Sequence, residues 1–279
     1  MRTRIFNKMT AKEVEHYIAR GGDTIFVAVG VVEMHGSLPL DVETVIPEAY
    51  AVAMAEKADG LAMINLPYFF PGGTIVSPGT VQVSVRESID YLMMIGRSLV
   101  AQGFRKIFLL SAHGPASMYI NSMCRDFFQE TKVHVCHLQP RMYGIDRSAM
   151  FDFKKRPRSY IEYGAYKIMG QMDYLPIDPN ASDEPLWGEE INPAMKELGD
   201  ALRPFGGQVS MLYESSKQHG GGRPFHSEQE RLEACVRGEQ ELRTHVEQMD
   251  LERLKKALEN YQGYVQTLIE RNPRLAGEY

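Results

Sequence analysis

The 279-residue sequence lacks the features that would hold a protein together, or anchor it, by means other than a folded core. Its three cysteines, Cys124, Cys136 and Cys235, show neither paired nor metal-type spacing, and so sparse a set is typical of a reduced cytosolic protein. The first residues contain no apolar stretch of signal-peptide type, and no apolar run reaches membrane-spanning length. We therefore expect a cytoplasmic protein without a membrane partner.

Other protein classes are disfavoured in the same way. The net charge is -5 and no basic patch stands out, so nucleic acid is not an expected partner. No G-x-G-x-x-G motif follows the first apolar run, which argues against a Rossmann-type nucleotide enzyme. With 44% hydrophobic and 24% charged residues the composition is that of an ordinary globular protein. Neither repeats nor low-complexity tracts interrupt it, and we expect one domain over residues 1–279.

Short apolar runs alternate with helical patterns along the first half of the chain. The runs are too apolar for strands with one solvent-exposed face, and they predict parallel strands that are buried on both faces. We expect strands at 24–32, 61–67, 105–112 and 133–138. We expect helices from Thr10 to the glycines at 21–22, at 44–57, from Ser84 to Gly103, and at 116–130. This order predicts a three-layer α/β protein with a mostly parallel central sheet.

The second half is less regular. From 141 to 225 no clear pattern holds, and the only tryptophan, Trp187, lies in a polar, proline-rich loop at 178–193. Ser227 is expected to open a final helical region that is broken or bent near Asp250.

Two polar clusters follow predicted strands. In open α/β sheets, sites form beyond the carboxyl ends of the strands. Glu33 and His35 follow the first strand at i and i+2, so both can face one point, and His113 follows the third strand. Asp41 and Glu43 return just before the next helix. Carboxylates and imidazoles together suit Zn, Mn or Fe, and a shared carboxylate could hold two ions.

Each of these residues also has a structural interpretation. Glu33 and His35 could be a charge pair that closes a strand, and His113 could simply cap a loop. His219 precedes three glycines, but no lysine follows them, so a plain turn is favoured over a phosphate-binding loop.

Three segments resemble the creatininase family. VEMHGSLPLDVET (32–44) resembles its E-x-H-G…LPL…D-T segment, SPGTVQVS (77–84) its F-P-G-T-I-S loop, and GFRKIFLLSAHGPAS (103–117) its N-G-H-G-G-N segment. Their order and separation agree over about half of the chain. The resemblance implies a parallel α/β fold, a metal-dependent hydrolase that uses one or two ions, a small-molecule substrate, and a homo-oligomer, since several members form hexamers.

The same resemblance suggests roles for individual residues. It implies that Glu33 and His35 are ligands of different ions, that His113 is a ligand of the first ion, and that Glu43 corresponds to a bridging aspartate. Because the loop is one residue shorter here, Asp41 could take the bridging role instead.

The chain also departs from the family pattern. N-G-H becomes Ser111-Ala112-His113, and Pro115 stands where creatininase has a carboxylate ligand. A glutamate-containing segment of other members finds its nearest counterpart at 161–170. This resemblance makes Glu162 a reserve metal ligand, and Glu162 and Lys167 are candidates for proton transfer. We therefore expect ring opening or deformylation of a cyclic amide or related carbonyl compound other than creatinine. Two alternatives are C–C ring opening of an inositol-derived diketone and a non-catalytic binding protein with a decayed second metal site.

Overall fold

A computed structural model describes residues 1–75, 77–144, 159–182, 192–213, 215, 218–219 and 223–277. Within these residues, four strands form one sheet in the order β2-β1-β3-β4, and every neighbouring pair is parallel. The strands are β1 (Thr24–Ala28), β2 (Leu61–Met63), β3 (Lys106–Leu110) and β4 (Cys136–Leu138). Each contains almost only apolar residues, because helices cover both faces of the sheet. The α-helices are α1 (Ala11–Ala19), α2 (Val42–Lys57), α3 (Val85–Ala101), α4 (Ser117–Thr131), α5 (Ile161–Ile168), α6 (Pro193–Leu202), α7 (Glu228–Gln248) and α8 (Leu251–Arg271).

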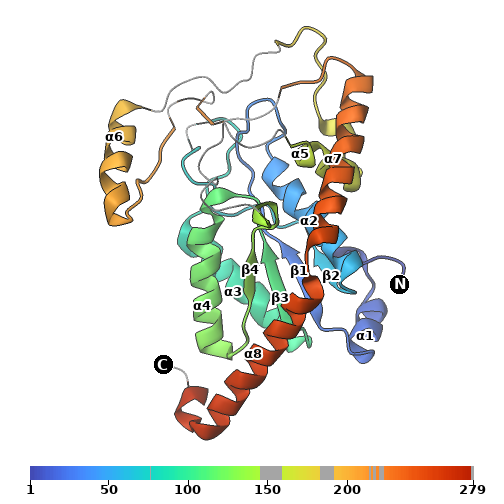
Figure 1. The fold of residues 1–279 in the computed structure, drawn as a ribbon, viewed down its shortest axis with the longest axis vertical. Helices are drawn as coiled ribbons and strands as arrows, with labels where there is room; N and C mark the ends of the chain where they lie inside the picture. The colour runs from blue at the N-terminus through green and yellow to red at the C-terminus, as the bar shows by residue number, and fades with distance from the viewer. Residues whose placement is uncertain are drawn as a thin grey trace.

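Two hydrophobic cores lie on opposite faces of the sheet. Phe26 and Phe108 point to the face covered by α2, α5 and α7, whereas Ile25 and Ile107 point to the face covered by α1, α3 and α4. Alternate strand residues therefore enter different cores, as the pleat requires. The predicted three-layer α/β architecture is confirmed, and Figure 1 shows the helices on either side of the strands.

The predicted helix starts agree well with the structure, whereas the strands were predicted too long. Thr10 and Ser84 both form the expected capping boxes, and the break near Asp250 separates α7 from α8. The first strand was expected to reach residue 32, but β1 ends at Ala28, although the Val29 amide still donates a hydrogen bond to the Leu110 carbonyl at the end of β3. An apolar run indicates that residues are buried. Residues 29–31 are buried, but they do not pair with a strand on each side. Trp187 lies outside the described residues.

The α5–α7 contact was not predicted, because helix α5 falls in the irregular region of the sequence. Gly164 of α5 faces Gly238 of α7, and a Cβ atom on Gly164 would lie 2.0 Å from the Gly238 carbonyl carbon. Only glycine at both positions allows the two backbones to approach this closely. Figure 1 shows α5 beside α7.

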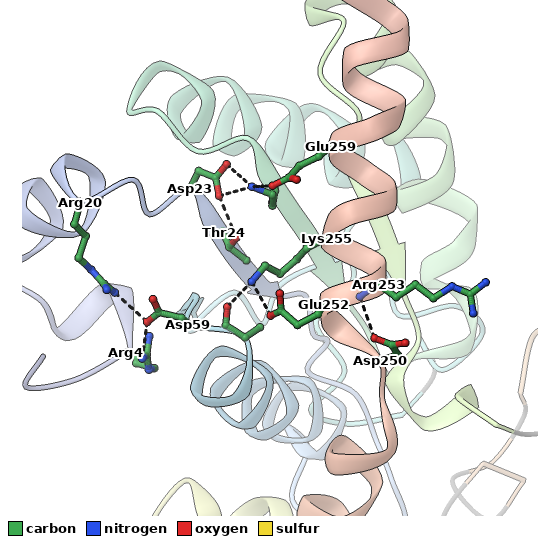
Figure 2. Close-up of polar contacts among 12 residues, drawn as sticks. Arg4, Arg20, Asp23, Thr24, Asp59, Asp250, Glu252, Arg253, Lys255 and Glu259 are labelled. Atoms are coloured by element: carbon green, nitrogen blue, oxygen red, sulfur yellow. Dashed lines mark hydrogen bonds and ion pairs between the residues drawn. The ribbon is translucent and has the colours of Figure 1, made fainter.

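Ion pairs anchor α8 at the amino edge of the sheet (Figure 2). Lys106 at the start of β3 lies 2.7 Å from Asp23 and 2.8 Å from Glu259 of α8. Lys255 of the same helix donates a hydrogen bond to the Ala58 carbonyl at 2.9 Å. Helix α8 is also held by Leu251 and Leu258, which are buried in the core. Among the helices of the described residues, none has the length and apolar character of a membrane span.

Candidate metal centre

Segments from three places in the sequence converge at the carboxyl edge of the sheet. The chain beyond β1 carries Glu33, the first turn of α2 carries Glu43, and the chain beyond β3 carries His113. Gly30 makes this convergence possible, since a Cβ atom there would lie 2.2 Å from Thr44 Oγ1. The Thr44 hydroxyl in turn donates a hydrogen bond at 2.9 Å to the carbonyl of the next residue after Gly30. The backbone after β1 is thereby held against the start of α2.

Glu33, Glu43 and His113 form the first group of candidate ligands. Their ligand atoms all lie within 4.8 Å of one another. His113 Nε2 is 3.3 Å from Glu33 Oε1 and 3.8 Å from Glu43 Oε2. Glu33 and His113 are fully or nearly fully buried, and the Thr74 hydroxyl donates a hydrogen bond to Glu33 Oε2 at 2.8 Å. This bond fixes one carboxylate oxygen and leaves the other facing His113.

Glu33, His35 and His219 form a second group that shares Glu33 with the first. Glu33 Oε1 lies 3.8 Å from His35 Nδ1 and 3.5 Å from His219 Nε2. The two imidazole rings meet edge to face, with their centroids 4.8 Å apart. His35 Nε2 is also 3.8 Å from Glu43 Oε1. The sequence did not identify His219 as a site residue. A histidine before a run of glycines is typical of a turn, and no local motif connects His219 to Glu33.

The cluster contains buried polar atoms that make no hydrogen bond. They are Glu33 Oε1, His35 Nδ1, Glu43 Oε2, His113 Nδ1 and His219 Nε2. His113 faces the carboxylates with Nε2, whereas the other four atoms lie toward the cluster itself. Most buried polar atoms in proteins have partners, so these four atoms need an explanation. Oxygen and imidazole nitrogen are the donors that bind Zn, Mn and Fe, and the set therefore fits a divalent ion.

The electrostatics of the cluster lead to the same conclusion. Burial raises the pKa of Glu43 well above its ordinary value, and the neighbouring charge of Glu33 raises it further. Burial also acts to raise the pKa of Glu33, but the adjacent imidazoles of His113 and His219 outweigh it and the pKa falls. Burial lowers the pKa of His35 to about 4, so this imidazole is neutral and able to ligate at pH 7. A cation among these groups would stabilise both carboxylates in their ionised form.

The remaining predicted residues lie outside both groups. The Tyr166 hydroxyl donates a hydrogen bond to Asp41 Oδ1 at 2.7 Å, and Asp41 therefore faces α5. Between the two alternatives that the sequence left open, this placement favours Glu43 as the ligand. Glu162 Oε2 is buried, makes no hydrogen bond and lies 3.7 Å from Arg141.

Lys167 lies on α5 and forms an ion pair with Glu239 of α7 at 3.0 Å. This contact anchors the side chain between the two helices. The role of Lys167 in proton transfer stays a prediction.

A parallel three-layer α/β fold with clustered carboxylates and imidazoles at the carboxyl edge defines a protein of metallohydrolase type. The profile of the creatininase family, described as creatinine amidohydrolase, matches residues 7–165. Because this match covers more than half of the chain, the protein belongs to the creatininase family.

Two curated relatives are similar over part of the chain. Creatinine amidohydrolase of Pseudomonas putida is 29% identical over 119 residues, which are 40% of this chain and 46% of that protein. The 3-dehydro-scyllo-inosose hydrolase of Thermotoga maritima is 32% identical over 111 residues, or 39% of this chain and 35% of that protein. The matched region thus spans less than half of either relative.

Solved creatininases share the fold over nearly the whole chain. A mutant creatininase complexed with creatine has a TM-score of 0.62 at 18% identity and covers 98% of this chain and 100% of its own. Structures described as Zn-Zn type and as Mn have TM-scores of 0.53 and 0.54, at 19% and 20% identity. Each of these two covers 85% of this chain and 96% of its own. At these identities the comparison shows the fold.

Proposed function

We propose that this protein is a metal-dependent hydrolase that opens or deformylates a small cyclic amide or related carbonyl compound other than creatinine. The observation that carries the proposal is the cluster of two carboxylates and three imidazoles with unpartnered buried atoms at the carboxyl edge of the sheet. Membership of the creatininase family supports the reaction class. Pro115, in place of the carboxylate expected from creatininase, supports a different substrate.

We assign Glu33, Glu43 and His113 as ligands of one divalent ion. His35, which lies next to them, is assigned as a further metal ligand. Zn, Mn and Fe suit these donors, and the solved creatininases named for Zn and Mn support that choice. When bound, such an ion lowers the pKa of water and polarises a carbonyl group. Glu33 and His113 are held by buried segments next to the strand ends, and rigid elements give a site its precision.

Proton transfer to the leaving group would fall to a side chain near the ligands. Glu162 Oε2 is buried, forms no hydrogen bond and lies 3.7 Å from Arg141, whereas Lys167 forms a closer ion pair with Glu239 at 3.0 Å, and this difference favours Glu162. Glu162→Gln should therefore lower kcat more than Lys167→Met does, with metal content unchanged in both variants.

The first experiment is metal analysis on protein purified without chelators or a histidine tag. We expect one or two ions per chain, and His113→Ala should lose at least one of them. Formation of the ring-opened amino acid from a panel of cyclic amides, or release of formate from formamides, would then support the proposed reaction. A protein that takes up no Zn, Mn or Fe would refute it.

The same assays separate two other functions. The Thermotoga maritima relative, which is named a 3-dehydro-scyllo-inosose hydrolase, motivates C–C ring opening of an inositol-derived diketone. That reaction would break a C–C bond and form a carboxylic acid, with neither a new amine nor formate. Bound metal without turnover of either substrate class would instead indicate a non-catalytic binding protein.

We also propose that the protein forms a homo-oligomer, with a hexamer as one expected form, and that it is cytoplasmic. The family resemblance supports the assembly, and three free cysteines support a reducing compartment. Light scattering coupled to size-exclusion chromatography measures the assembly directly.

A further inference from the structure

We infer that His219 is a ligand of a second divalent ion, which it holds together with Glu33 and His35. This inference rests on the proposed function and extends it to a residue that lies far along the chain from the other ligands. The ligand atoms of these three residues fall within 4.8 Å of one another. His219 Nε2 is buried without a hydrogen-bond partner and lies 3.5 Å from Glu33 Oε1.

Residues 211–213 are held against Gly73 by backbone contacts. The Tyr213 amide donates a hydrogen bond to the Gly73 carbonyl at 3.0 Å. A Cβ atom on Gly73 would lie 2.6 Å from the Met211 carbonyl oxygen, so the two segments touch through their backbones. The Tyr213 ring also packs against the His219 ring, with centroids 5.2 Å apart. Tyr213 therefore contacts His219 directly and is itself held by the segment at Gly73.

The segment at Gly73 also orients Glu33. Thr74, the next residue, donates the hydrogen bond that fixes Glu33 Oε2. Residues 73–74 thus contact both the shared carboxylate and Tyr213, whose ring packs against His219. This arrangement is what a preorganised ligand set requires, because supporting contacts fix the donors before an ion binds.

Two carboxylates connect the two groups of ligands. Glu33 Oε1 faces His113 Nε2 at 3.3 Å as well as His219. Glu43 contacts His113 through Oε2 and His35 through Oε1, both at 3.8 Å. Shared carboxylates are typical of sites with two ions, since each reduces the repulsion between neighbouring cations.

His219 also compensates for a ligand that the sequence lacks. Pro115 occupies the position of the expected carboxylate, and it packs against Gly72, where a Cβ atom would lie 3.0 Å from Pro115 Cγ. The loop after His113 therefore offers no third donor for a second ion. Imidazole is a good ligand for the same metals, so His219 restores the number of donors with different chemistry.

The test is zinc binding by variants of His219. Protein stripped with a chelator is titrated with Zn²⁺ in a calorimeter, and metal per chain is measured after dialysis. We expect two ions in the unaltered protein and one in both His219→Ala and His219→Gln, with the second site weakened at least about tenfold. His16→Ala, at an exposed histidine of α1, is the matched control and should keep both ions.

The outcomes distinguish the inference from the proposed function. The ion retained by the His219 variants shows that they are folded and that the first site is intact. If the His219 variants bind two ions, or if the unaltered protein binds only one, the inference is wrong and the proposed hydrolase stands. If folded variants lose both ions, the assignment of His219 to a second ion alone is wrong. If the unaltered protein binds none, both proposals fall.

Discussion

Replacing Gly238 by alanine should separate α5 from α7. A Cβ atom at this position would lie 1.9 Å from the Tyr160 carbonyl oxygen and 2.6 Å from the Gly164 nitrogen. Non-bonded heavy atoms pack at about 3.5–4.0 Å, so the two helices would have to move apart by well over about 1 Å. The clashing atoms belong to the backbone, and no side-chain rotation can relieve the contact.

Two opposing terms set the size of the effect. Alanine favours a helix over glycine by about 1 kcal/mol. Overpacking costs about 1–3 kcal/mol, and more where the neighbours cannot yield. Because backbone meets backbone here, we expect Gly238→Ala to lower the free energy of unfolding by at least about 2 kcal/mol. Helix α5 carries Tyr166, so the hydrogen bond to Asp41 should weaken as well.

Urea unfolding followed by circular dichroism measures this change. Gly263→Ala on α8 is the matched control, since a Cβ atom there meets no atom within 4 Å. The control should be unchanged or stabilised by up to about 1 kcal/mol. If Gly238→Ala is as stable as Gly263→Ala, then the close helix contact does not exist in solution and the reasoning is refuted.

Three further substitutions test other contacts. Tyr166→Phe removes a hydrogen bond to a carboxylate and should cost about 1.5–3 kcal/mol in thermal or urea unfolding; no change would mean that Asp41 is satisfied by water. Lys106→Met leaves two carboxylates without their buried cation and should cost about 1–3 kcal/mol, with a loss that shrinks at low pH; a pH-independent loss would contradict the ion pairs. Burial lowers the pKa of His137 to about 4. The unfolded chain, with an ordinary pKa near 6.5, binds more protons between those values, so stability should fall by at most about 3 kcal/mol as the pH drops from 6.5 to 4. His137→Gln should flatten this slope, and an unchanged slope would count against the assignment.

Local patterns were sufficient for much of the fold and for part of the site. Capping boxes at Thr10 and Ser84 give helix starts, because the side-chain hydrogen bonds that make them involve residues only three apart. Glu33 and His35 could be paired from sequence since alternate residues of an extended chain share a face. His113 joined them because parallel strands end at a common edge, and the structure brings all three together.

By itself, the sequence determined the alternating α/β order, the family and the carboxyl edge as the place of the candidate site. These depend on local periodicity and on motifs within a few residues of a strand end. Only the tertiary structure decided that Glu43 faces the cluster while Asp41 turns to Tyr166, and that His219 lies beside Glu33. The physical reason is that these contacts join residues far apart in the chain. No short-range pattern predicts the path of the backbone between them. Tertiary packing decides this path, as it does where Gly30 packs against Thr44.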